Sequence, residues 1–238
     1  MNYIFDVDGT LTPSRGIMND EFRSFFLEFA KNNDCYLVTG GDRDATIKQV
    51  GPEIYNACKL VFNCCGNDVY EQDNQIYKNI WQLSFEAMVY LKGILRTSEY
   101  PTRTGWHFDH RIGMCNFSVV GRNADRQQRT DYFEWDKESD ERGRICSELN
   151  SLYPYLEARV GGETGVDIFE RGKHKGQILD YFDDGSDIMF FGDRTDEQGN
   201  DYPIASRLSK DQSFQVRDDL HTMELLKFQE NNNDRVFR

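Results

Sequence analysis

The sequence lacks several features that mark whole classes of protein. No run of apolar residues approaches the roughly 20 that a helix needs to span a bilayer. None of the six cysteines forms a C-x-x-C pair, and the cysteine–histidine spacing of a zinc site is missing. Met1 is not followed by a basic region and a long apolar stretch, so no signal peptide is expected. These absences favour a cytoplasmic protein whose cysteines are reduced thiols.

Positive charge is also scarce. The 238 residues include 28 Lys and Arg against 41 Asp and Glu, which gives a net charge of −13. Proteins that bind nucleic acids or anionic membranes are normally basic, so we expect neither kind of partner. An acidic chain that binds a phosphorylated substrate must gather its few cations at one place.

What the sequence does contain begins with the string DVDGTLT, in which Asp6 and Asp8 directly follow the apolar residues 3–5. Side chains two apart on an extended chain point to the same side, so both carboxylates could face one reacting phosphate. One could attack phosphorus and the other could transfer the proton. Two carboxylates this close repel each other, which favours a bound divalent cation such as Mg2+. The alternative is a plain Asp-Gly turn before a helix, a common and less specific pattern.

The first third of the chain alternates between strand and helix patterns. Residues 3–5, 35–38 and 60–63 are typical of strands, and residues 21–31 and 45–50 of helices. This alternation predicts an α/β fold with a parallel sheet and helices on both faces.

Two further strand ends carry residues suited to the same chemistry. Ligands of open parallel sheets bind beyond the carboxyl ends of the strands. Thr39 and Gly40 could offer a hydroxyl and backbone N–H groups to phosphate oxygens, and Asp193 could share a cation with Asp6 and Asp8. Each segment alone is a weak signal, because such residues are common in turns.

The pattern changes in the middle of the chain and returns near its end. Paired strands mixed with helices, including one long helix over residues 130–152, predict an inserted α+β unit. We therefore expect a core domain of residues 1–78 and 172–238 and an inserted domain of residues 79–171.

At this point the chain resembles known families. The string DVDGT is the nucleophile motif of the haloacid dehalogenase-like phosphotransferases, in which the first Asp is the nucleophile and the second the general acid/base. Four stretches, spread in order over nearly the whole chain, resemble eukaryotic-type phosphomannomutases: FDVDGTLTPSR, HRIGMCNFSVVGR, GGETGVDIFERGKHK and FFGDRTDEQGND. The resemblance implies a Rossmann-like core with a cap domain of the C2b type, which closes over a hexose phosphate.

The resemblance also implies roles for individual residues. The core cation of the family, for which Arg171, Lys173 and Lys175 are candidates, matches Lys175. The metal site would use Asp6, Asp8, Asp193 and the Asn200-Asp201 loop, with Asp196 a less certain member. The substrate contacts match Arg15, Gly40, Arg111, Arg122, Arg129 and Asp167. The three cap arginines would hold the phosphate that is not reacting, a task suited to guanidinium groups.

The chain departs from the family pattern at the sugar site. The family usually reads SFDVF where this chain has GVDIF, so Gly165 stands in place of a serine that contacts substrate. The family's GWDK and ENG elements are also changed, to Gly172-Lys173-His174-Lys175 and Cys65-Gly66-Asn67. The residues for phosphate handling are kept, so the change bears on recognition of the sugar.

Three functions remain open from the sequence. The first is a mutase that interconverts hexose 1-phosphate and hexose 6-phosphate, with mannose as the expected sugar, through an aspartyl phosphate on Asp6 and a bisphosphate intermediate. The second is an Mg2+-dependent sugar-phosphate phosphatase on the same scaffold. The third, a regulator without catalysis, would fit a chain that had lost Asp6 or Asp8. The resemblance further implies a hexose 1,6-bisphosphate activator, a homodimer through the cap and a place in GDP-mannose biosynthesis.

Overall fold

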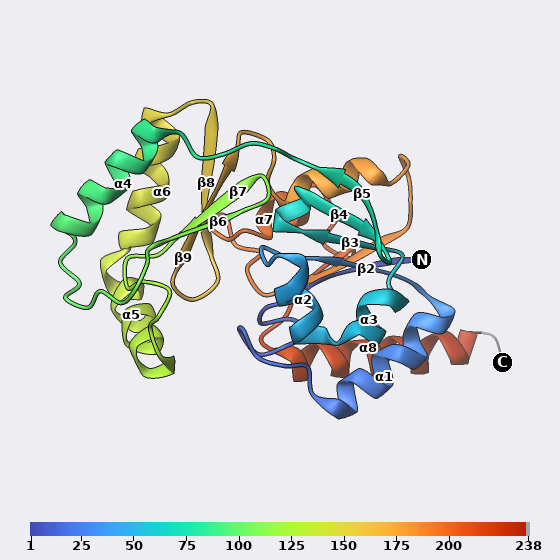
Figure 1. The fold of residues 1–238 in the computed structure, drawn as a ribbon. Coiled ribbons are helices and arrows are strands. Elements are labelled where there is room, and N and C mark those ends of the chain that lie inside the picture. Colours follow the sequence, from blue (N-terminus) through green and yellow to red (C-terminus); the bar gives the residue numbers. More distant parts are fainter. Residues whose placement is uncertain (237–238) are drawn as a thin grey trace.

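The structure, a computed structural model, describes the backbone of residues 1–236 and the side chains of residues 1–230. Its strands form two separate sheets, and Figure 1 shows each with its own helices, in two lobes that meet beside β7 and α7.

The larger sheet carries the amino-terminal motif on its central strand. Its order is β11-β10-β1-β2-β3-β4-β5, parallel from β11 to β3 and antiparallel from β3 to β5. The strands are β1 (Asn2–Asp6), β2 (Asp34–Val38), β3 (Leu60–Asn63), β4 (Asp68–Glu71), β5 (Asn74–Lys78), β10 (Ile188–Gly192) and β11 (Ser213–Gln215). Because β10, β1 and β2 run parallel, their carboxyl ends meet at one edge of the sheet.

Both faces of this sheet are buried, as the unbroken apolar run of β1 requires. Phe5 packs with Phe22 and Phe26 on one face, and Ile4 packs with Ile178 on the other. The first face is covered by α1 (Asp20–Asn32), α2 (Arg43–Val50), α3 (Pro52–Ala57) and α8 (Asp219–Val236), and the second by the 3-10 helix η2 (Lys175–Tyr181) and α7 (Tyr202–Ala205).

The smaller sheet is antiparallel and has the order β6-β7-β9-β8. Its strands are β6 (Phe108–Arg111), β7 (Met114–Phe117), β8 (Leu156–Gly161) and β9 (Gly165–Glu170), and its helices are α4 (Phe85–Thr97), α5 (Arg126–Ser139) and α6 (Glu141–Leu152). Cys115, Phe117 and Ile168 point into the apolar core shared with these helices. Because side chains alternate along a strand, the residues of β7 and β9 that alternate with these three point to the opposite face, toward the larger sheet.

The long helix predicted over residues 130–152 is wrong, because two helices occupy this segment. Asp140 adopts a left-handed conformation, φ 50°, and separates α5 from α6. The corner is stabilised by buried Asp136, which accepts from the backbone N–H of Arg142 at 2.9 Å and from its Nε at 2.7 Å. The polar residues of this corner have the spacing expected of a charged helix surface. The sequence pattern therefore predicts one continuous helix and gives no sign of the break at Asp140.

The predicted fold class is confirmed: a mostly parallel α/β core carries an inserted α+β unit with its own antiparallel sheet. The exact boundaries, 79 and 171, stay a prediction, and residues 237 and 238 lie outside the described residues. Within the described part of the chain, no helix is both long enough and apolar enough to cross a membrane.

Candidate functional site

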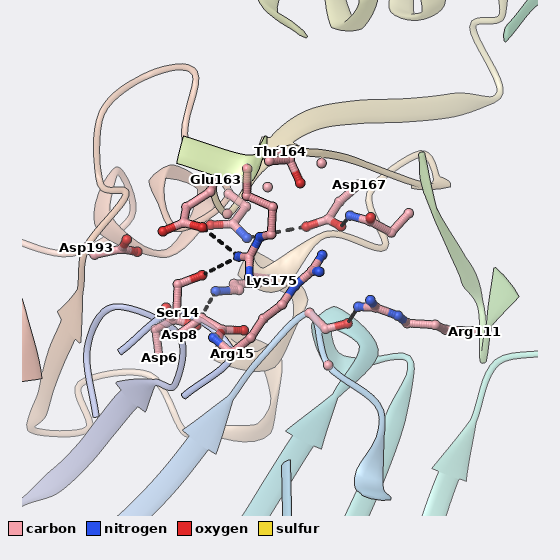
Figure 2. Close-up of a pocket in the computed structure, with 18 of the residues that line it drawn as sticks. Asp6, Asp8, Ser14, Arg15, Arg111, Glu163, Thr164, Asp167, Lys175 and Asp193 are labelled. Atoms are coloured by element: carbon pink, nitrogen blue, oxygen red, sulfur yellow. Dashed lines mark hydrogen bonds and ion pairs between the residues drawn. The ribbon is translucent and has the colours of Figure 1, made fainter. Parts of the chain in front are cut away.

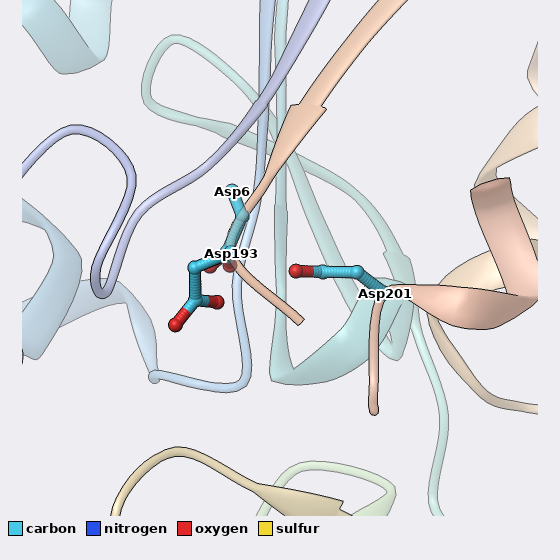
Figure 3. A group of neighbouring side chains, drawn as sticks. All are labelled: Asp6, Asp193 and Asp201. Carbon is cyan, nitrogen blue, oxygen red and sulfur yellow. The ribbon is translucent and has the colours of Figure 1, made fainter. Parts of the chain in front are cut away.

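Three carboxylates and one lysine meet at the carboxyl ends of the central strands. Asp6 ends β1, Asp193 follows β10, and Asp201 precedes α7. One oxygen from each lies within 4.8 Å of the other two (Figure 3), and we call these residues the carboxylate cluster. Lys175 Nζ, at the start of η2, donates to Asp6 Oδ1 at 2.5 Å and to Asp201 Oδ1 at 2.7 Å. Lys175 is 1% exposed, so this ion pair is dry.

The carboxylate cluster holds more negative charge than its lysine neutralises. Burial raises the pKa of Asp6 well above its usual value; Lys175 opposes this shift, while Asp201 and Asp193 add to it. Burial and Asp201 raise the pKa of Asp193 to about 7. Burial alone would lower the pKa of Lys175, but Asp201 and Asp6 raise it, so the lysine stays charged. Three clustered carboxylates with an unmet charge fit a hard divalent cation such as Mg2+.

A glycine allows Asp193 to approach the motif loop. Gly9 has φ +80°, in the left-handed region that glycine tolerates. A Cβ atom there would lie 2.6 Å from Asp193 Oδ2, closer than any side chain permits. The glycine of the DxDG pattern therefore lets Asp193 lie close to the loop that carries Asp6 and Asp8.

Asp8 lies beside the carboxylate cluster, not in it. Its Oδ1 accepts from the backbone N–H of Arg15 at 2.5 Å and from Gln49 Nε2 at 2.9 Å. Both Asp8 and Asp6 line the same cavity. These contacts fix the orientation of Asp8, whereas its roles as a proton carrier and as a metal ligand stay predictions. Asp196 pairs with Arg194 at 3.2 Å and lies outside the cluster.

Thr39 and Gly40 take different positions at the end of β2. Thr39 is fully buried, its Oγ1 accepts from the backbone N–H of Gly41 at 3.0 Å, and it is not among the residues that line the cavity. Gly40 does line the cavity, and its carbonyl accepts from Arg111 Nη1. Direct contact of Thr39 with a phosphate stays a prediction, and its visible role is to hold the Gly40-Gly41 turn.

The smaller sheet presents a polar row to the carboxylate cluster. Asp109 on β6 is in register with Asn116 on β7, and Asn116 with Asp167 on β9. Asn116 Nδ2 donates to Asp167 Oδ1 at 2.7 Å, and Asn200 reaches Asp167 Oδ2 from the core at 3.4 Å. The period of two along each strand therefore builds a polar wall opposite Asp6.

Four arginines line the cavity beside this row, and Figure 2 labels two of them, Arg15 and Arg111. With Arg122 and Arg129 they form what we call the arginine cluster. Asp109 Oδ2 accepts from Arg111 Nη2 at 2.7 Å and from Arg122 Nη2 at 2.8 Å. Arg122 Nη1 also donates to Asn116 Oδ1 at 2.9 Å.

The four arginines of the arginine cluster outnumber the three acidic residues beside them, Asp109, Asp167 and Glu163. Removal from water, together with the charges of Arg122 and Arg129, lowers the pKa of Arg15 to about 10. Burial and the neighbouring Arg111 likewise lower the pKa of Arg122. Cations that depress one another's pKa favour a bound anion, and guanidinium groups suit phosphate.

Gly165 leaves space that the polar row uses. A Cβ atom at this position would lie 2.4 Å from Asn116 Nδ2. The absence of a side chain therefore lets Asn116 reach both Asp167 and Arg122. Asn116 Nδ2 thus lies in the space that a side chain at position 165 would enter.

One cavity of about 70 Å³ joins the two clusters. Of the predicted site residues, it is lined by Asp6, Asp8, Arg15, Gly40, Arg111, Arg122, Arg129, Asp167, Lys175 and Asp193. Asn200 of the predicted metal loop also lines it, whereas Thr39 and Asp201 are not among the lining residues. The sequence reasoning missed Ser14, Gln49, Asp109, Asn116 and Glu163. Asp109 lies two residues before Arg111 on one strand, so alternation could have placed it on the same face as that arginine. Ser14, Gln49, Asn116 and Glu163 carry no such signal.

The raised pKa of Asp193 predicts a pH-dependent stability of the metal-free protein. Its folded value of about 7 lies above the unfolded value of 3.8, so the folded state binds the proton more tightly. The stabilisation is present at low pH and is lost as the pH rises toward 7. Relative to an Asp193→Asn variant, the wild type should lose stability between about pH 4 and about pH 7 in urea unfolding. A stability difference between the two proteins that stays constant across that range would contradict the raised pKa of Asp193. Mg2+ should abolish the pH dependence of that difference.

Comparison with known proteins connects this geometry with a family. A family model described as eukaryotic phosphomannomutase matches residues 22–227. A phosphomannomutase of Arabidopsis thaliana is 30% identical over 84% of this chain and 85% of its own, and one of Saccharomyces cerevisiae is 32% identical over 84% and 83%. A haloacid dehalogenase-like hydrolase from Bacteroides thetaiotaomicron has the same fold, with a TM-score of 0.56 over 95% of this chain and 98% of its own at 14% identity.

Proposed function

Because this chain belongs to the eukaryotic phosphomannomutase family, we propose that it moves a phosphoryl group between the 1- and 6-positions of a hexose. It is a phosphomannomutase-like enzyme of the phosphotransferase type. The observation that carries the proposal is one cavity that joins the carboxylate cluster, with Lys175, to the arginine cluster.

Asp6 carries the phosphoryl group in this proposal. Its Oδ1 is held by Lys175 at 2.5 Å at the end of a rigid central strand. Attack of a carboxylate oxygen on phosphorus gives an aspartyl phosphate and releases the sugar oxygen. Asp8, oriented by Gln49, gives a proton to that oxygen and later takes one from the hydroxyl that accepts the phosphoryl group.

Fixed charges stabilise the transfer. Lys175 lies where negative charge develops on the phosphoryl oxygens, and it cannot move because it is held by two buried carboxylates. A divalent cation held by Asp6, Asp193 and Asp201 would supply further charge neutralisation. Such preorganised charges cost no rearrangement during the reaction.

The arginine cluster would bind the other end of the substrate. A bisphosphate intermediate must turn around so that either phosphate can face Asp6, and the same guanidinium groups can then hold whichever phosphate is distant. The cavity of about 70 Å³ is far smaller than the roughly 300 Å³ or more of common ligand sites. Substrate entry therefore requires the cap, which contacts the core through Arg111–Gly40 and Arg129–Ser14, to open.

Hydrolysis is the second candidate, because a side cavity gives water a route. This cavity of about 300 Å³ is lined by Asp8, Asp193, Ser14 and Glu163, and all four also line the central cavity. Water that entered here could attack the aspartyl phosphate, lose a proton to Asp8 and release inorganic phosphate. The mutase remains the leading proposal because the arginine cluster is complete.

Removal of one guanidinium group tests the second phosphate site. Arg122→Ala should lower kcat/KM for a hexose 1-phosphate by about 10- to 100-fold, since a charge-assisted hydrogen bond to phosphate is lost. Hydrolysis of a small aryl phosphate, whose single phosphate is the one that reacts at Asp6, should change little. Arg126→Ala, an exposed arginine of α5 outside the cavity, is the control. Equal losses for both substrates would contradict the phosphate-binding role.

Several finer points belong to the same proposal and rest on the family resemblance. They are mannose as the preferred hexose, a hexose 1,6-bisphosphate activator, a homodimer through the cap, a cytoplasmic location and service in GDP-mannose biosynthesis. The apolar residues Phe85 and Val89, exposed on α4, are compatible with a cap interface.

A further inference from the structure

One carboxylate points into the arginine cluster from the cap, and the proposed mechanism does not use it. Glu163 lies in the turn between β8 and β9, and its Oε2 accepts from Arg129 Nη2 at 2.6 Å (Figure 2). Arg129 Nη2 also donates to Ser14 Oγ of the core at 3.2 Å. The Arg129 side chain is 14% exposed, so an anion beside it is poorly screened by water.

Arg129 keeps an unused donor at this position. Its Nε is buried and has no hydrogen-bond partner among the described residues. A buried guanidinium that is only partly satisfied has room for a ligand with several acceptor oxygens. A phosphate offers three such oxygens, whereas Glu163 reaches only Nη2.

The two acidic residues beside the arginines differ in how they are held. Asp109 is on strand β6 and accepts from both Arg111 and Arg122, so its removal would unpair two cations. Glu163 is in a turn, contacts one arginine and has a side chain that is 39% exposed. Asp109 is therefore a fixed part of the site, and Glu163 is the acid that a ligand can replace.

We propose that Glu163 is a displaceable internal anion that occupies Arg129 in the substrate-free enzyme and yields it to the non-reacting phosphate of the substrate. This inference rests on the proposed function, because it assigns that phosphate to the arginine cluster. Glu163 would thus set the affinity for sugars that carry a second phosphate group or have their phosphate at the distant end.

The surroundings of Glu163 allow its side chain to move while its backbone stays in place. The carbonyl of the preceding residue, Gly162, accepts from Arg142 Nη1 at 2.8 Å, and Arg142 is itself anchored by buried Asp136. Glu163 also lines the side cavity of about 300 Å³, which offers space for the displaced carboxylate. Rotation about side-chain bonds then suffices for the exchange.

Competition with an internal anion weakens binding by a calculable factor. When the binding-competent state is only fractionally populated, the apparent Kd rises by the inverse of that fraction. An ion pair whose carboxylate is 39% exposed favours its paired state modestly, so Glu163→Gln should tighten binding by about three- to tenfold. Removal of the carboxylate also adds one unit of positive charge to a cluster in which Asp109, Asp167 and Glu163 face four arginines.

The test compares two charge-neutralising variants of the full chain with Mg2+ present. Calorimetry with mannose 6-phosphate should give a Kd about three- to tenfold lower for Glu163→Gln than for the wild type. Glu170→Gln, which removes the same charge from an exposed position at the end of β9, should match the wild type. Glu163→Asp, whose carboxylate is one methylene shorter, should give an intermediate Kd.

Two results would overturn the inference. An unchanged or weaker affinity in Glu163→Gln would mean that Glu163 instead positions Arg129 for substrate. An equal gain in Glu170→Gln would mean that only net charge matters. The proposed function fails separately: a wild type that binds mannose 6-phosphate but never isomerises it is no mutase, whatever the Glu163→Gln variant shows.

Discussion

Asp6→Asn should abolish turnover of every phosphorylated substrate, with kcat reduced by about a thousandfold or more. An amide cannot form the acyl phosphate, because it lacks the negative charge and the nucleophilicity of the carboxylate. In the proposed function the arginine cluster holds the distant phosphate, and this change does not touch that cluster. The Kd for mannose 6-phosphate should therefore stay close to the wild-type value while kcat collapses.

Folding stability separates this effect from a structural one. In the metal-free protein, Asp6, Asp193 and Asp201 share one lysine, so loss of one carboxylate relieves repulsion. The Asp6→Asn variant should consequently be as stable as the wild type, or more so, in urea with EDTA. Asp20→Asn, an exposed carboxylate at the start of α1, serves as the control. Residual activity within tenfold of wild type would disprove the nucleophile assignment.

Lys175→Met should cause the largest loss of stability. Methionine fills much of the volume of the lysine stem but leaves Asp6 and Asp201 buried without their cation. Breaking a buried ion pair from one side costs about 3–5 kcal/mol, since the remaining charge stays desolvated. The loss should lessen at low pH, where the carboxylates can bind protons instead.

Metal binding should partly reverse the effect of Lys175→Met. A divalent cation on the carboxylate cluster would neutralise the same charges. Replacing EDTA with Mg2+ should therefore raise the urea midpoint of Lys175→Met by more than it raises that of the wild type. Lys173→Met, two residues away and stacked over the ring of Tyr77 at 5.4 Å, should shift neither quantity much. A Lys175→Met variant with wild-type stability in EDTA would show that the lysine does not balance the cluster.

The sequence was sufficient for those parts of the site that follow from strand periodicity and strand ends. Asp6 and Asp193 follow from apolar strands that end in polar residues, and the structure brings them within 4.8 Å. Lys175 and Asp201 could be named only through the family resemblance, because η2 and α7 are short and have no strong periodicity. Helices α3 and α7 were missed for the same reason.

Other parts of the site depend on contacts that no local pattern encodes. Side-chain alternation suggested that Asp8 shares a face with Asp6, but β1 ends at Asp6, and the loop that follows turns Asp8 toward Gln49. Glu163 and Arg129 are 34 residues apart and belong to different elements. The sequence does not show that a side chain at Gly165 would collide with Asn116, because the two residues lie on different strands.

The central claim, that the phosphoryl group on Asp6 returns to the sugar, is tested most directly by the products. The full chain is incubated with Mg2+, mannose 1-phosphate and a hexose 1,6-bisphosphate, and mannose 6-phosphate and inorganic phosphate are quantified together. The proposed mutase forms mannose 6-phosphate with little release of phosphate. Release of inorganic phosphate without mannose 6-phosphate would contradict the claim and identify a phosphatase.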